Sequence, residues 1–99
     1  MKIVKSQDGT KVFFALDGRL DTVTAPELQN VLIPAFDDAK SVTLDFVGVA
    51  YVSSAGLRVL LLGEKTAKSK NCSMILINVS QEIKDIFEMT GFSDILKIA

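Results

Sequence analysis

The feature that most constrains the fold is an alternation of short strand-like segments with longer segments of helical spacing. Residues 73–77 are almost continuously apolar, which is typical of a strand buried on both faces of a parallel sheet. Residues 54–69, just before them, repeat their leucines at helical intervals. Neighbouring parallel strands need a crossover connection, and a helix is the usual one. We therefore expect an α/β fold.

An antiparallel hairpin is expected to open this fold. Strand-like residues 3–5 and 11–16 flank Asp8-Gly9, a pair that suits the positive backbone angles of a hairpin turn. The later strands are expected at 42–46, 73–77 and 96–98, and the helices at 24–33, 54–69 and from Ser80 to Gly91. This order predicts a mainly parallel central sheet with right-handed crossovers and about three main helices.

The first helix carries specific expectations. Thr24 and Glu27 have the spacing of a capping box, with Pro26 in the tolerant first turn. Pro34 lacks an amide hydrogen and clashes with the carbonyl four residues back, so we expect it to kink or end the helix near Ile33. The expected buried stripe consists of Ala25, Leu28, Val31, Leu32, Ala35 and Phe36.

Composition and charge narrow the possible functions. Hydrophobic residues make up 48% of the 99 and charged residues 23%, which is typical of a globular domain. The net charge is -1, from 11 basic and 12 acidic residues, and the basic residues are scattered, which argues against direct nucleic-acid binding. No apolar run approaches the ~20 residues of a membrane span. We expect one cytoplasmic domain covering residues 1–99, without membrane insertion.

The residue types also argue against an enzyme. The chain has no histidine, the usual general base and metal ligand near neutral pH. Cys72 is the only cysteine, so an intrachain disulfide and a cysteine-rich metal site are excluded. No Ser-x-x-Lys or Gly-x-Ser-x-Gly spacing surrounds Ser53 and Ser54. No cofactor or metal is expected.

Ser53 and Ser54 lie where a strand pattern changes into a helical one. Serine at a helix start can accept a hydrogen bond from an amide without an intrahelical partner. In open α/β sheets, ligands and partners gather beyond the carboxyl ends of the parallel strands. We expect Asp21, Asp45, the two serines and Asn78–Ser80 to meet at that edge.

Two features near this edge allow alternative interpretations. Asp21 and Asp45 could be paired carboxylates for acid–base or magnesium chemistry, or could simply bond loop amides. The second helix has more apolar residues than a core stripe needs. If Leu57, Leu60 and Leu61 fill the core, Val59 or Leu62 turns outward beside Arg58, either against another element or toward a partner.

Taken together, four segments resemble the STAS domain family, most closely its single-domain anti-sigma factor antagonists. They are Gly18-Arg19-Leu20-Asp21, Val42-Thr43-Leu44-Asp45, Ser53-Ser54-Ala55-Gly56-Leu57 and Gly91-Phe92-Ser93-Asp94-Ile95-Leu96. The resemblance spans nearly the whole chain. The absence of an appended transporter or sensor domain favours the antagonist subgroup.

The resemblance implies partner switching. The unmodified protein would bind an anti-sigma factor that is also a serine kinase, phosphorylation would release it, and a metal-dependent serine phosphatase would reverse the modification. The family motif selects Ser54, in preference to Ser53, as the phosphorylated residue. Ser53 stands where the family commonly has Asp, and Ala55 where it has Ser or Thr.

The expected partner-binding residues are Asp21, Ser53, Ser54, Ala55, Gly56, Arg58 and Leu62, with Asp45 in a structural role. Two rival functions remain. One is a non-switching cytoplasmic STAS subunit of a lipid or anion transport complex, in which Ser54 only caps the helix. The other is a small hydrolase or nucleotide-binding enzyme using Ser54, Asp21 and Asp45, against which the missing histidine and phosphate loop argue.

Overall fold

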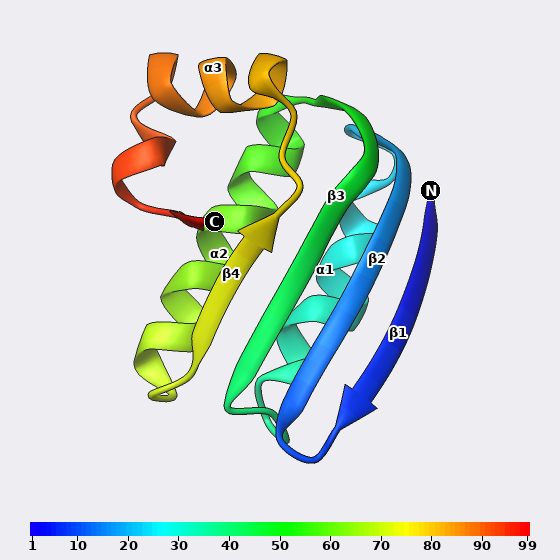
Figure 1. Ribbon diagram of the computed structural model, residues 1–99, viewed down its shortest axis with the longest axis vertical. Coiled ribbons are helices and arrows are strands. Elements are labelled where there is room, and N and C mark those ends of the chain that lie inside the picture. The colour runs from blue at the N-terminus through cyan, green and yellow to red at the C-terminus, as the bar shows by residue number, and fades with distance from the viewer.

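The computed structural model describes residues 1–99, and its five strands form one sheet in chain order (Figure 1). The strands are β1 (Lys2–Asp8), β2 (Lys11–Leu20), β3 (Ser41–Val52), β4 (Ser73–Ile77) and β5 (Lys97–Ile98). The helices are α1 (Ala25–Ala35), α2 (Ser54–Ser69) and α3 (Gln81–Met89), with a short 3₁₀ turn at Phe92–Asp94. Only β1 and β2 are antiparallel. The predicted fold class, opening hairpin and helix count are confirmed.

The sheet has one covered and one open face. Helices α1 and α2 lie behind it in Figure 1, and α3 lies beyond the upper end of β4. Along β2, the side chains of Val12, Phe14 and Leu16 are buried, whereas the alternate residues Phe13 and Asp17 are more exposed. This alternation is what a strand with one packed face requires. The hydrophobic core therefore lies between the sheet and the two helices behind it.

Helix α1 begins where the sequence predicts, but the expected capping box is wrong. The Thr24 hydroxyl makes no cap bond, because it donates to the Arg19 carbonyl at 2.6 Å and accepts from the Asp21 amide at 2.9 Å. The helix ends at Ala35, one residue after Pro34 and two residues beyond the expected end near Ile33. Pro34 lies in the last turn, where it removes only one intrahelical hydrogen bond. Val31 is also exposed, while the rest of the expected stripe is buried.

Strands β2 and β3 are longer than the sequence predicts. β3 continues from the expected end at Phe46 to Val52, and β2 continues through Gly18 to Leu20. Their register shifts twice, between Ala15 and Asp17 and between Gly18 and Arg19. A Cβ atom at Gly48 would lie 2.9 Å from the Leu16 carbonyl oxygen. The absence of that atom lets the strands remain paired through the irregularity.

The remaining elements follow the prediction closely. Helix α2 has the predicted bounds, the Ser80 hydroxyl accepts a hydrogen bond from the Ile83 amide at the start of α3, and Gly91 follows α3 with a φ of 79°. β5 is two residues long, shorter than the expected 96–98. No helix has both the length and the apolar character needed to cross a bilayer.

Candidate functional site

The two serines at the start of α2 have different surroundings. Ser53 is the N-cap: its backbone is extended, with φ -90° and ψ 174°, and its hydroxyl oxygen accepts from the Gly56 amide at 3.3 Å. Its own amide donates to the Leu20 carbonyl at 2.9 Å, which ties the helix start to the end of β2. Ser54 is the first helical residue, its side chain is exposed, and its hydroxyl takes part in no hydrogen bond. Capping is therefore performed by Ser53, which leaves the Ser54 hydroxyl free.

Gly56 allows α2 to begin so close to β2. The residue is buried in the first turn of the helix. A Cβ atom there would lie 2.7 Å from Leu20 Cγ and 3.0 Å from the Leu20 carbonyl oxygen. Both distances are too short for a methyl group without movement of the strand or the helix. Glycine here thus fixes the position of Ser53 and Ser54 against the end of β2.

Asp21 organises the turn that follows β2. Its Oδ1 atom accepts from the Val23 and Thr24 amides at 3.0 and 3.1 Å, and from the Thr24 hydroxyl at 3.2 Å. The backbone hydrogen bond from Thr24 is the main reason that the pKa of Asp21 lies below its usual value. Asp21 follows Leu20, whose carbonyl accepts the hydrogen bond from the Ser53 amide. The turn that begins at Asp21 therefore adjoins the start of α2, although the two are far apart in the chain.

A cationic and aromatic pair, not expected from the sequence, lies next to this turn. The Arg19 guanidinium is 4.2 Å from the centroid of the Tyr51 ring, and its Nε atom is 3.8 Å from Asp21 Oδ2. Arg19 and Tyr51 are register partners in β2 and β3. Residues 32 apart in the chain can be matched only once the strand register is known. The sequence segment Gly18–Asp21 was the only available signal.

A groove of about 300 Å³ separates the first turns of α1 and α2. Its lining includes Ala25, Pro26 and Gln29 from α1 and Ala55, Arg58 and Leu62 from α2. Arg58 is exposed and Leu62 is 39% exposed, so the outward orientation expected for these residues is confirmed. Val59 is instead buried with Leu57 and Leu60, while Leu61 is half-buried. A concave, partly apolar surface therefore adjoins the start of α2.

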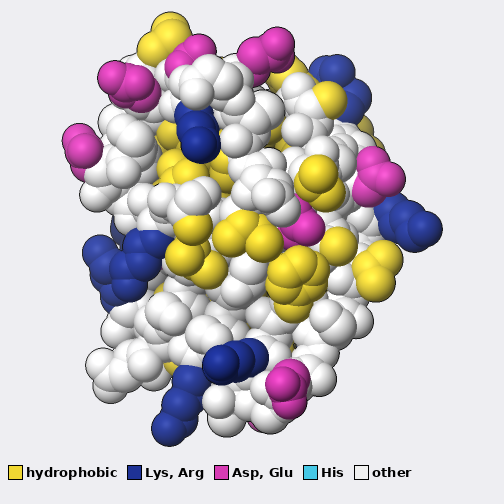
Figure 2. Space-filling model, viewed as in Figure 1, with side chains coloured by type: hydrophobic (Ala, Val, Ile, Leu, Met, Phe, Trp, Pro, Cys, Tyr) yellow, Lys and Arg dark blue, Asp and Glu magenta, His cyan; other side chains and the backbone are white.

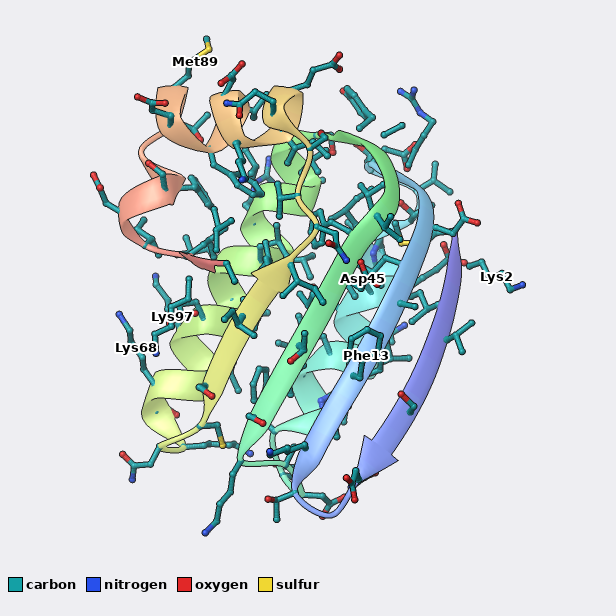
Figure 3. The ribbon with its side chains drawn as sticks, in the orientation of Figure 1. Lys2, Phe13, Asp45, Lys68, Met89 and Lys97 are labelled. Carbon is teal, nitrogen blue, oxygen red and sulfur yellow. The ribbon has the colours of Figure 1, made fainter.

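Asp45 does not join this cluster, so the expected meeting of four segments at one edge is wrong. Its Oδ1 atom accepts from the Val47 amide and from Asn78 Nδ2, both at 3.0 Å. The residues between Asp45 and Val52 continue β3, so the carboxylate lies several residues before the start of α2 along the strand. Figure 3 shows Asp45 on the open face, in the middle of the sheet. Asp45 is bonded to Asn78 in the middle of the sheet, whereas the Asp21 turn adjoins the serines at the start of α2.

The acidic residues do not gather into a metal site. No group of three or more His, Cys, Asp or Glu side chains is arranged to hold a metal ion. The paired-carboxylate interpretation of Asp21 and Asp45 also fails on geometry, because the two lie at different levels of the sheet. The site instead consists of the exposed Ser54 hydroxyl at the start of α2, the Asp21 carboxylate in the turn after β2, and the groove between α1 and α2.

The fold and site define a mixed α/β domain with one helix-covered face and a serine hydroxyl presented at a helix start. The chain belongs to the STAS domain family, whose model matches residues 2–99. It is 27% identical over 96 residues to the anti-sigma-B factor antagonist of Listeria monocytogenes, covering 96% of this chain and 84% of the relative.

Solved structures share the fold. The anti-sigma factor antagonist SpoIIAA in its unphosphorylated form superposes with a TM-score of 0.84 at 17% identity, covering 99% of this chain and 88% of that one. The phosphorylated form of SpoIIAA, described as a Bacillus cell fate determinant, superposes with a TM-score of 0.78 at 17% identity, covering 99% and 91%. The fold of this chain therefore matches both forms of that protein.

Proposed function

We propose that this protein is an anti-sigma factor antagonist that acts by partner switching in the cytoplasm. Its unmodified form binds an anti-sigma factor serine kinase, and phosphorylation of Ser54 by that kinase releases it. A metal-dependent serine phosphatase restores the binding form. The likeness to named antagonists supports the class, and the single STAS domain of residues 1–99 carries the switch.

The observation that carries the choice of residue is the free hydroxyl of Ser54. A kinase must reach the acceptor oxygen, and Ser54 is exposed and unbonded. Ser53 is half-buried and its oxygen accepts from the Gly56 amide, so its modification would remove the helix cap. The two serines therefore have different proposed roles: Ser53 caps α2, and Ser54 is the residue that is phosphorylated.

Phosphorylation at this position changes the surface more than the fold. It adds roughly 1.5 to 2 negative charges, and a negative charge at the first turn of a helix interacts favourably with the helix dipole. Arg58 lies four residues further along the same helix, a spacing at which side chains face each other. The phosphate therefore has favourable partners within α2, while the outer surface becomes more negative beside Asp21.

The proposed partner surface joins this charge switch to the adjoining groove. It comprises Asp21, the segment 53–56 and the outward residues Arg58 and Leu62. Asp45 lies elsewhere and holds the loop after β4 through Asn78. A phosphate placed in this contact weakens binding by repulsion and by the cost of removing its water.

A kinase assay tests the proposal. The protein, its Ser53→Ala variant and its Ser54→Ala variant are incubated with the anti-sigma factor serine kinase of the source organism and ATP, and phosphosites are mapped by mass spectrometry. Phosphate is expected on wild type and Ser53→Ala but not on Ser54→Ala. Modification confined to residues outside 53–54 would refute the assignment of Ser54. Binding only to a transport complex would instead favour a non-switching STAS subunit.

A further inference from the structure

The open face of the sheet carries an apolar band that no part of the chain covers. Val4 is 51% exposed and Val47 is 74% exposed, and Phe13, Ile75 and Ile77 are half-buried on the same side. Figure 2 shows hydrophobic side chains gathered across the middle of this face, and Figure 3 shows Phe13 and Asp45 on it. Contiguous exposed apolar surface of this kind marks interaction sites.

Strand register arranges this face in rows that cross the sheet. The first row has Lys2 beside Asp17, the second has Val4, Ala15, Asp45 and Ile77, the third has Ser6, Phe13, Thr43 and Ile75, and the fourth has Asp8, Lys11, Ser41 and Ser73. Val47 adjoins the first row, where it lines a surface hollow with Lys2 and Asp17. The middle rows are therefore mainly apolar, with Ser6, Thr43 and Asp45 among them, and the outer rows carry their charges on β1 and β2.

We propose that this face binds a second copy of the chain, sheet against sheet. The two-fold axis lies between the second and third rows and runs parallel to them. Rotation about it places the first row of one copy on the fourth row of the other, and the second row on the third. Sheets packed face to face keep their strands within about 30° of each other at a spacing of about 10 Å.

Charge complementarity supports this occupant. The rotation sets Lys2 against the partner's Asp8 and Asp17 against the partner's Lys11, so opposite charges meet at both outer rows. All four side chains are exposed and free to adopt these contacts. Symmetry repeats both pairs, which gives four attractive contacts and no like-charge contact among these residues. A C₂ interface requires such self-complementarity.

The shapes of the middle rows also match. Val4, Ala15 and Val47 line a hollow of about 240 Å³. The rotation places the partner's Phe13 over Ala15, so a large ring meets a small side chain at this hollow. Ile77 meets the partner's Ile75, and Asp45 faces the hydroxyl of the partner's Thr43. Large and small side chains that alternate across facing layers allow close packing.

The size of the face predicts a weak, reversible dimer. Four strands at about 4.8 Å spacing and seven residues at about 3.3 Å rise give a face of roughly 19 Å by 23 Å on each copy, which is below the size of stable specific interfaces and within the range of transient ones. Ser54 and the α1–α2 groove belong to the helix side of the sheet, so the dimer leaves them accessible. The inference therefore does not depend on the proposed switch.

Complementary charge reversal tests the arrangement. A dimer of two Lys11→Asp chains places Asp17 opposite the introduced aspartate twice. A dimer of two Asp17→Lys chains places Lys11 opposite the introduced lysine twice. In the mixed dimer, the lysine introduced at position 17 of one variant faces the aspartate introduced at position 11 of the other, and the unchanged Lys11 faces the unchanged Asp17. Sedimentation equilibrium over a wide concentration range should show wild type approaching twice the monomer mass. Each variant alone should dissociate at least about tenfold more readily, and the equimolar mixture should recover wild-type association.

Matched controls carry the same charge changes away from this face. Lys68→Asp on α2 and Glu82→Lys on α3 should associate like wild type. Circular dichroism of every variant verifies that it is folded. A wild type that stays monomeric overturns the proposal, as does a mixture no more associated than the separate variants. Dimers unaffected by either reversal also overturn it, because pairing of β1 edges would leave these β2 side chains outside the interface.

Discussion

At the scale of single residues, the adjacent serines at the start of α2 differ in what their oxygens contact. Ser53 bonds the Gly56 amide, whereas the Ser54 hydroxyl has no partner within the protein. The Ser53 side chain therefore stabilises the start of α2, and the Ser54 hydroxyl is accessible for modification. The distinction is open to a stability measurement that involves no partner.

Removal of the two hydroxyls should have unequal effects on stability. Ser53→Ala loses the N-cap bond and should lower the free energy of unfolding by about 1 kcal/mol. Ser54→Ala should change it by less than about 0.5 kcal/mol, as expected for an exposed, unbonded side chain. Urea unfolding followed by circular dichroism measures both, and Ser53→Asp is the control because Asp is also a good N-cap. A larger loss for Ser54→Ala would contradict the assigned roles.

Asp21 should make stability depend on pH. Its pKa in the folded protein is lowered, chiefly by the Thr24 backbone hydrogen bond, so folding favours the carboxylate. The stabilisation is present above the ordinary Asp value of about 3.9 and is lost as pH falls through the lower folded-state pKa. Asp21→Asn should therefore be less stable than wild type at pH 7, with a difference that shrinks in acid.

An NMR titration of the Asp21 carboxyl carbon gives the direct measurement. The resonance should titrate below the ordinary Asp range in wild type. In Thr24→Val it should titrate higher than in wild type, because the hydroxyl donor is lost while the backbone donors remain. Titration of wild-type Asp21 at or above the ordinary value would disprove this account of the turn.

At the scale of elements, the start of α2 is held against the end of β2 by close backbone contact. The Ser53 amide bonds the Leu20 carbonyl, and Gly56 leaves room for the Leu20 side chain. The strand therefore positions the helix that carries Ser54. A substitution at Leu20 or Gly56 should therefore shift the position of Ser54, although neither residue is the proposed site of phosphorylation.

Gly56→Ala should destabilise the protein by about 1–3 kcal/mol, because its methyl group would overlap Leu20. Leu20→Ala leaves a cavity and should cost about 2–5 kcal/mol. The double variant should cost less than the sum, since the shortened side chain at position 20 makes space for the new methyl group. Chemical denaturation of all four proteins completes the cycle. Strictly additive losses would count against the contact as the cause.

Element boundaries show what could be predicted from the sequence and what could not. α2 and β4 were predicted with their observed bounds because their apolar patterns are long or continuous. The extension of β3 to Val52 was missed because Gly48 and the register shift disturb the alternation. The expected position of Asp45 is wrong for the same reason. A strand that ended at Phe46 would place the Asp45 carboxylate at the end of the sheet, near the serines.

The other failures involve contacts that the spacing of residues in the sequence does not reveal. Thr24 had the spacing of a helix cap, but its hydroxyl bonds Arg19 and Asp21 in the preceding turn instead. The contact between Arg19 and Tyr51 depends on the β2–β3 register, which sequence spacing does not reveal. Ser54 was predicted through the family pattern, and the structure adds the reason that Ser53 is the cap.

At the scale of the whole molecule, the chain has two separate surfaces of interest. The start of α2 and its groove lie on the helix side, and the apolar band lies on the open face of the sheet. The core between sheet and helices separates them. A charge added at Ser54 should therefore alter one surface without unfolding the domain.

Charge variants at Ser54 should test this tolerance. Ser54→Asp places a negative charge at the helix start and should retain the wild-type circular dichroism spectrum and at least the wild-type melting temperature at low salt. Ser54→Lys, which is matched in exposure but opposite in sign, should melt lower, and added salt should reduce the difference. A Ser54→Asp protein that is unfolded or melts below Ser54→Lys would contradict a fold-preserving switch.

The affinity of the protein for the proposed partner, an anti-sigma factor serine kinase, before and after modification of Ser54 tests the central claim most directly. Calorimetric titration should show that wild type and Ser54→Ala bind similarly. The Ser54-phosphorylated protein should bind at least about tenfold more weakly, a loss of about 1.4 kcal/mol or more, and Ser54→Asp should be weakened in the same direction. Equal affinity of the phosphorylated and unmodified proteins would contradict partner switching through Ser54.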